Sequence, residues 1–102
     1  MSFDPNAIDE LIHGRIRLAV MAFLSTANAA EFTDLRNRIG TTDGNLSTHL
    51  RKLEEADYVT VTKGFVARKP QTVVALTEKG RAAFLQYLDA LKGLIPPKAA
   101  AQ

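Results

Sequence analysis

Residues 40–62 decide the fold, and they read GTTDGNLSTHLRKLEEADYVTVT. Leu46, Leu50 and Leu53 follow one another at intervals of four and three residues, which places them on one face of an α-helix. The opposite face carries small, polar and charged residues. We therefore predict an amphipathic helix over residues 43–56, with its leucines turned toward a core and its polar face turned outward.

The start of this helix follows closely on the end of another. Thr41 or Thr42 supplies a side-chain oxygen that can cap the first turn. Gly40 suits the left-handed position that ends the preceding helix, which we predict over residues 34–39 with Thr33 as its cap. Two short helices joined by a tight glycine-containing turn form the pattern of a helix-turn-helix.

After the second of these helices, the hydrophobic period changes from 3.6 to 2. Residues 58–62, YVTVT, alternate between apolar and polar side chains, and residues 71–76, QTVVAL, form a second run rich in β-branched residues. Residues 63–70 between them contain a glycine, a proline and three cations. This pattern predicts two strands joined in a β-hairpin whose tip spans residues 63–70 and is positively charged.

A helix is also expected on each side of this region. Apolar residues recur at helical spacing from residue 8 to 24, with Gly14 as a possible break, and residues 26–30 are small and polar enough to form a loop. Thr77 caps a last helix predicted over residues 78–95, before the two prolines that follow it.

The predicted order is helix, helix, helix, hairpin, helix. This is a mainly α fold with a β-hairpin, the winged helix-turn-helix. A chain of 102 residues has the usual length of one domain. We therefore predict a single domain over residues 1–102, with flexible tails at residues 1–7 and 96–102.

Composition excludes several classes of function. The chain has no cysteine, which excludes disulfides, cysteine-based zinc sites and a thiol nucleophile. Its two histidines, His13 and His49, lie far apart without clustered carboxylates, so neither a metal-sensing site, nor an enzyme active site, nor a cofactor is expected. The longest apolar run, residues 18–24, is too short to cross a membrane, and no signal peptide is recognisable. A cytoplasmic protein is expected.

The charges are unevenly distributed along the chain. The net charge is only +2, but residues 1–35 carry −3, whereas residues 36–81 carry nine basic and five acidic side chains. The positive charge is therefore concentrated in the region of the helix-turn-helix and the hairpin, where a polyanion would bind. An ordinary solvated surface is the alternative interpretation of this feature.

Two stretches resemble a known family, the MarR/ArsR-like winged-helix regulators. They are NLSTHLRKLEEADYV at residues 45–59 and RKPQTVVALTEKGRAAF at residues 68–84. The resemblance implies a dimer held by the first and last helices, DNA reading by the third helix and phosphate contact by the hairpin, called the wing. A small effector molecule is also possible in this family type, but no residue here identifies one. Many relatives have glycine where this chain has Asp57, so we expect a left-handed backbone there, at a cost of ~1 kcal/mol.

The expected DNA-binding surface combines the third helix with the wing. Short polar side chains let a helix approach base edges in the major groove, and long cations reach phosphates. The candidates on the helix are Asp43, Gly44, Asn45, Ser47, Thr48, Arg51 and Lys52, and those on the wing are Lys63, Arg68 and Lys69. The alternatives are a solvated helix face and a solubilising hairpin. Asp43 is better explained by the helix dipole than by a contact to cytosine.

The last helix carries an apolar seam that predicts self-association. Its members are spaced by four, three and four residues, as in helices that pack on a partner helix. With the apolar residues near the N-terminus, the expected dimer interface comprises Ile8, Leu11, Ile12, Phe84, Leu88, Leu91 and Ile95. A helix buried in the core of its own chain is the alternative.

Together these features predict a sequence-specific regulator of transcription. We expect a homodimer, acting as a repressor, that binds a pseudo-palindromic operator in double-stranded DNA. The alternative function is a winged-helix adaptor that binds other proteins and no DNA.

Overall fold

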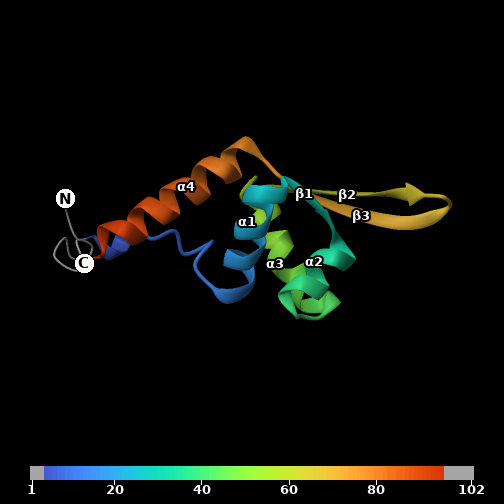
Figure 1. Ribbon diagram of the computed structural model, residues 1–102, viewed down its shortest axis with the longest axis horizontal. Helices are drawn as coiled ribbons and strands as arrows, with labels where there is room; N and C mark the ends of the chain where they lie inside the picture. Colours follow the sequence, from blue (N-terminus) through green and yellow to red (C-terminus); the bar gives the residue numbers. More distant parts are fainter. Residues whose placement is uncertain (1–3, 96–102) are drawn as a thin grey trace.

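The computed structural model describes residues 4–95 and has the predicted winged-helix fold (Figure 1). A body of three helices lies in the middle, α4 extends toward one end of the molecule, and a hairpin projects from the other. The overall extents are 56 × 23 × 22 Å. The elements are, in chain order, the 3₁₀ turn η1 (Pro5–Ala7), α1 (Arg15–Ala27), β1 (Ala29–Glu31), α2 (Phe32–Ile39), α3 (Asp43–Glu55), β2 (Val59–Val66), β3 (Lys69–Leu76) and α4 (Glu78–Gly93).

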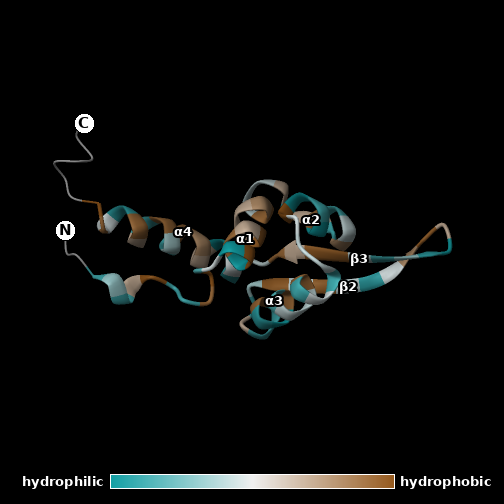
Figure 2. Ribbon diagram, turned by 90° about the horizontal axis from the view of Figure 1, so that it is seen from below, coloured by the Kyte–Doolittle hydropathy of each residue, from teal (hydrophilic) through white to brown (hydrophobic). Residues whose placement is uncertain are grey.

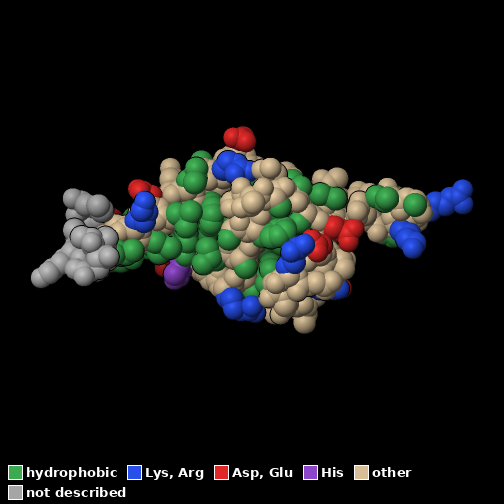
Figure 3. Space-filling view, viewed as in Figure 1, with side chains coloured by type: hydrophobic (Ala, Val, Ile, Leu, Met, Phe, Trp, Pro, Cys, Tyr) green, Lys and Arg blue, Asp and Glu red, His purple; other side chains and the backbone are tan. Residues whose placement is uncertain are grey.

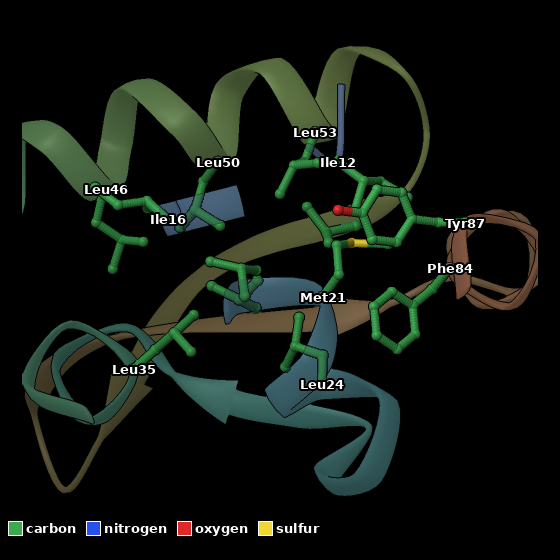
Figure 4. Packing of buried hydrophobic residues seen from close by; sticks show 13 residues of the cluster. Ile12, Ile16, Met21, Leu24, Leu35, Leu46, Leu50, Leu53, Phe84 and Tyr87 are labelled. Atoms are coloured by element: carbon green, nitrogen blue, oxygen red, sulfur yellow. The ribbon is translucent and has the colours of Figure 1, made fainter. Parts of the chain in front are cut away.

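The core is formed by one face of each helix and the inner part of the hairpin. Leu46, Leu50 and Leu53 of α3 are at most 2% exposed, as their spacing predicts. Burying each such side chain contributes roughly 1.5–3 kcal/mol. Figure 4 shows them meeting side chains of α1 and α4. The other buried members of the core are Ile12, Ile16, Val20, Met21, Leu24, Leu35, Val59, Val74, Phe84 and Tyr87.

The helix-turn-helix forms as predicted, with one cap misplaced. Gly40 ends α2 in the left-handed conformation, at φ 76°, and the Thr42 side chain accepts a hydrogen bond from the backbone N–H of Asn45 at 3.2 Å. However, α2 begins at Phe32, so the prediction that Thr33 caps it was wrong. The preceding residue, Glu31, occupies the cap position instead, because it still belongs to a strand.

That strand, β1, was predicted as part of a loop. It is only three residues long and pairs antiparallel with residues 73–75 of β3, which gives the sheet order β1-β3-β2. A strand of three residues contains too little alternation to be recognised locally. It extends the hairpin into a three-stranded sheet beside α2 and thereby fixes the base of the wing.

The hairpin is longer than its sequence pattern indicates. β2 continues to Val66 and β3 begins at Lys69, so the turn consists of Ala67 and Arg68 alone, and the prediction of a hairpin connection over residues 63–70 was wrong. Ala67 and Arg68 have φ values of 51° and 70°. A two-residue turn with both φ values positive matches the right-handed twist of the strands. Figure 2 shows β3 changing from hydrophobic near the body to hydrophilic farther out.

Pro70 lies inside β3 without interrupting the hairpin. The N–H of Leu76 donates to the carbonyl of Asn28 at 2.8 Å, on the β1 side of the strand. Backbone nitrogens alternate between the two edges of a strand. The nitrogens of residues 74, 72 and 70 therefore face the same side as the nitrogen of Leu76. β1 pairs only as far as Val73, so the nitrogen of Pro70 faces an open edge where no ladder bond is needed.

The segment before α1 is irregular, whereas a helix from residue 8 was predicted. The Asp9 side chain accepts from the N–H of Leu11 at 2.9 Å and from the hydroxyl of Tyr58 at 2.6 Å. These bonds hold the segment against the start of β2 and replace helical pairing. Burial and the Asp9 carboxylate raise the pKa of Tyr58 to about 12. Within the predicted tail at residues 1–7, Pro5–Ala7 form a 3₁₀ turn.

The junction between β3 and α4 lies close against Tyr58, the residue before β2. The Thr77 hydroxyl accepts from the N–H of Gly80 at 2.9 Å, as expected for a cap. The Gly80 Cα lies so close to β2 that an added Cβ would stand 2.1 Å from the Tyr58 carbonyl oxygen. Asp57 has φ 65°, which confirms the left-handed position predicted for it. The helix ends at Gly93 rather than residue 95, and the predicted tail at residues 96–102 lies outside the described residues.

Candidate nucleic-acid interface

An open groove separates α3 from the base of the wing. It has a volume of about 410 Å³ and receives Ser47 and Arg51 from α3 and Lys63 from β2. Ser47 and Arg51 were predicted on the third helix and Lys63 on the wing, and the fold brings the two elements together at one concave surface. The predicted residue Asp43 and the core residue Leu50 also line the groove, together with residues that were not predicted for the site: Phe32, Glu54, Val61 and Thr72.

The remaining candidates on α3 lie on its outer surface. Gly44, Asn45, Thr48 and Lys52 are all exposed, on the side of the helix opposite its buried leucines. The Thr48 hydroxyl donates to the Gly44 carbonyl at 3.0 Å, and its oxygen remains free to accept a further hydrogen bond. The outer face of α3 therefore presents small polar groups at its start and cations farther on.

Asp43 is held by a partner within the chain. Its carboxylate lies 2.7 Å from the Arg36 guanidinium of α2, and Arg36 also donates to the Asn37 side chain. The ion pair links the two helices of the helix-turn-helix across their turn. Because Asp43 is 68% exposed, the pair is worth at most about 1 kcal/mol, but it neutralises the one acid at the start of α3.

Several cations of the basic middle region pair with other groups of the same chain. Arg38 pairs with Asp34 at 3.0 Å and lies over the ring of Phe23. Arg81 of α4 donates to the Ser25 carbonyl and to the Asn28 side chain, which ties the start of α4 to the end of α1. The positive charge available to a ligand near the groove therefore comes mainly from α3 and the wing.

His49 lies at the edge of α3 and contacts α1. Its Nδ1 lies 2.8 Å from the guanidinium of Arg17, which is a donor, so the imidazole accepts in its neutral form. Burial, Arg17 and Lys52 all lower the pKa of His49. Arg17 also donates to the Leu11 carbonyl, which makes it the connection between α3 and the segment before α1.

The two remaining wing candidates lie away from the groove. Arg68 occupies the two-residue turn, and Lys69 pairs with Val66 at the last rung of the hairpin. Figure 3 shows lysine and arginine side chains at the far tip of the projecting hairpin. The cations of the wing thus form two groups, Lys63 beside α3 and Arg68 with Lys69 at the tip.

The apolar seam predicted on α4 is only partly accessible. Ile12 and Phe84 are 0% and 6% exposed and pack in the core of their own chain, so they are not part of the accessible stripe, and their place in a dimer interface stays a prediction. Ile8, Leu11 and Leu91 are half-buried and pack against that core. The exposed apolar residues of α4 and its end are Leu85, Leu88 and Ile95, at 60%, 40% and 49%. Leu85 replaces Phe84 in the accessible stripe.

Comparison with known proteins relates this geometry to a family. The family described as winged helix DNA-binding domain matches residues 16–95. An uncharacterised protein of Methanocaldococcus jannaschii is 34% identical over 79 residues, which are 78% of this chain and 86% of that protein. Among residues 4–95, no helix is both long enough and apolar enough to span a membrane.

Solved structures show the same fold. A transcriptional regulator homologue protein from Pyrococcus horikoshii OT3 is 31% identical, with a TM-score of 0.79, over 84% of this chain and 85% of that chain. A MarR family regulator from Neisseria meningitidis is 16% identical, with a TM-score of 0.55, over 85% of this chain and 65% of that chain. The predicted likeness to MarR-family regulators is thus confirmed at the level of the fold.

Proposed function

The chain belongs to the winged helix DNA-binding domain family, and on that premise we propose that it is a repressor of transcription that binds double-stranded DNA as a homodimer. The observation that supports this most directly is the groove shared by Ser47, Arg51 and Lys63. One concave surface then offers a polar group for base edges and two cations for phosphates, beside the carboxylates of Glu54 and of Asp43, which is paired with Arg36. Such a regulator acts in the cytoplasm, where it meets DNA.

In this proposal, α3 and the wing have different roles. Asn45, Ser47 and Thr48 lie near the start of α3, where a recognition helix reads base edges in the major groove. Lys63, Arg68 and Lys69 of the wing contact the phosphate backbone, which adds affinity without sequence preference. Arg51, in the groove, reaches either a guanine edge or a phosphate.

The dimer of the proposal uses the accessible stripe of α4. Leu85 and Leu88 belong to α4 and Ile95 follows it, and α4 extends away from the body on the side opposite the wing (Figure 1). A two-fold axis there leaves both copies of α3 free to enter successive major grooves about 34 Å apart. The expected operator is therefore pseudo-palindromic.

DNA binding is tested with a salt series on duplexes selected from a randomised pool. We expect a steep loss of affinity with salt for the wild type. Lys63→Ala removes one phosphate-binding cation from each protomer, so the plot of log affinity against log salt should become shallower by about one per protomer. Lys92→Ala, which changes another exposed lysine near the end of α4, is the matched control and should leave the slope unchanged. A wild type whose binding ignores salt, or that selects no duplex, would support the adaptor function instead.

The dimer is tested by light scattering. Leu88→Glu places a charge in the accessible stripe and should produce monomers, whereas Gln86→Glu, two residues away and also exposed, should remain dimeric. If Leu88→Glu is still a dimer, the interface lies elsewhere.

A further inference from the structure

The tip of the wing carries two large apolar side chains that the fold does not use. Phe65 is 76% exposed and Val66 is 55% exposed, and neither belongs to the core. They lie between Lys63 on one side and Arg68 and Lys69 on the other. An exposed phenylalanine surrounded by cations on a projecting hairpin contributes little to folding, so its surroundings favour a role in contact with a polyanion.

The register of the hairpin shows which way Phe65 faces. Lys63 is paired with Thr72, and two residues farther out Phe65 is paired with Pro70. Side chains two residues apart on a strand share a face, and so do directly paired residues of neighbouring strands. Since Lys63 and Thr72 line the groove beside α3, Phe65 and Pro70 continue that face toward the tip. Val66 lies on the opposite face.

The length of the wing matches the geometry of a duplex. From Val61 in the groove to Phe65, the strand advances by roughly 13 Å at about 3.3 Å per residue. Half a turn of DNA is about 17 Å, given ~34 Å per turn, so Phe65 lies most of that distance from the inner end of the groove. With α3 in a major groove, the Phe65–Pro70 pair therefore projects toward the adjacent minor groove.

We propose that Phe65, supported by Pro70, is an apolar wedge that enters the minor groove, partly unstacks one base step and bends the duplex. This inference rests on the proposed DNA-binding function. Phenylalanine and proline are among the side chains that proteins insert between base steps in this way. Arg68 and Lys69 then hold the phosphates on either side of the opened step. Pyrimidine–purine steps are the easiest to unstack, so the wedge selects such a step at the position it meets.

The test measures bending and unstacking separately from affinity. A duplex selected by the wild-type protein carries a fluorescent donor and acceptor at its ends, and 2-aminopurine replaces adenine at successive positions in a set of such duplexes. The variants are Phe65→Ala, Phe65→Leu and Val66→Ala. Val66→Ala is the matched control, because it removes an exposed apolar side chain from the opposite face of the same tip.

We expect the wild type to bring the duplex ends closer and to raise 2-aminopurine fluorescence at one position in each half-site. Phe65→Ala should lose both signals at saturating protein and weaken binding by about tenfold, whereas Phe65→Leu and Val66→Ala should keep both signals. The wedge is overturned if Phe65→Ala still bends and unstacks the duplex, or if the wild type does neither. In those cases, salt-dependent binding that is weakened by Lys63→Ala leaves the proposed function standing. A wild type that binds no duplex removes both proposals.

Discussion

The two halves of the wing have the same secondary structure but different environments. At the base, Val59 and Val74 are at most 1% exposed, and β1 adds a third strand. At the tip, Phe65 and Val66 are mostly exposed, and β2 pairs with β3 alone. The base is held by packing, whereas the tip is held by backbone hydrogen bonds and a tight turn. Residues of the base should therefore determine folding, and residues of the tip should determine what the protein binds.

The largest effect is expected where α4 meets the base. Gly80→Ala forces a Cβ to 2.1 Å from the Tyr58 carbonyl, so the helix must shift, and we expect a loss of about 3 kcal/mol in the free energy of unfolding. Gly44→Ala is the matched change in α3, where a Cβ meets open space, and it should stabilise by roughly 0.5–1 kcal/mol. Urea denaturation measures both. Equal effects of the two changes would contradict the close approach at Gly80.

The contrast between base and tip is tested more directly by two identical changes in the hairpin. Val74→Ala removes buried methyl groups and should cost about 2 kcal/mol. Val66→Ala, at 55% exposure, should change the free energy of unfolding by less than about 0.5 kcal/mol. If both substitutions cost the same, the tip would have to be packed against something when the protein folds.

A smaller effect is expected at the turn itself. Ala67 is left-handed and occupies the first position of a two-residue turn that favours asparagine. Ala67→Asn should therefore stabilise the tip by roughly 0.5 kcal/mol while keeping Arg68 in place. The readout is slower amide hydrogen exchange in residues 63–72, with the exchange of the base as an internal control. Unchanged exchange at the tip would mean that the turn does not limit its opening.

The smallest effect concerns pH and should arise where α3 contacts α1. The pKa of His49 is lowered in the folded protein, so the unfolded chain binds a proton there more readily. Stability associated with neutral His49 is thus present above about pH 6.5 and is lost as the pH falls through its folded pKa. Melting temperatures at pH 7.5 and 5.5 should differ less in His49→Gln than in the wild type. Lys52→Gln should also reduce the difference, because Lys52 helps to lower that pKa.

Local patterns in the sequence were sufficient to predict the helix-turn-helix and the start of each strand of the hairpin to within two residues. The leucine spacing of α3, the caps at Thr42 and Thr77 and the left-handed Gly40 depend on neighbours within a few residues. The left-handed conformation of Asp57 was inferred from a resemblance, and it too depends on near neighbours, because the Asp57 N–H donates to the carbonyl of Glu54. At these positions, residues within a few places along the chain determine the backbone conformation, and the predictions for them were confirmed.

The errors share a different origin, because they depend on contacts between distant segments. The N-terminal segment is irregular because Asp9 bonds Tyr58, 49 residues away, and no spacing of apolar residues reveals that bond. Pro70 and Gly64 were interpreted as breakers, but pairing across the hairpin overrides them. Likewise, the groove combines α2, α3 and both wing strands, so Phe32, Glu54 and Thr72 had no signal as neighbours of Arg51.

The placement of Pro70 has a further consequence for aggregation, which depends on how the sheet edges of different molecules meet. Within the sheet of residues 29–76, the outer part of β3 has no neighbour on its β1 side, and such an edge is a template for aggregation. At Pro70 the edge lacks a donor, and the adjacent Lys69 repels the same edge of another molecule. Pairing of this β3 edge with another molecule is thereby disfavoured, which leaves the apolar tip beside it available for heterologous contacts.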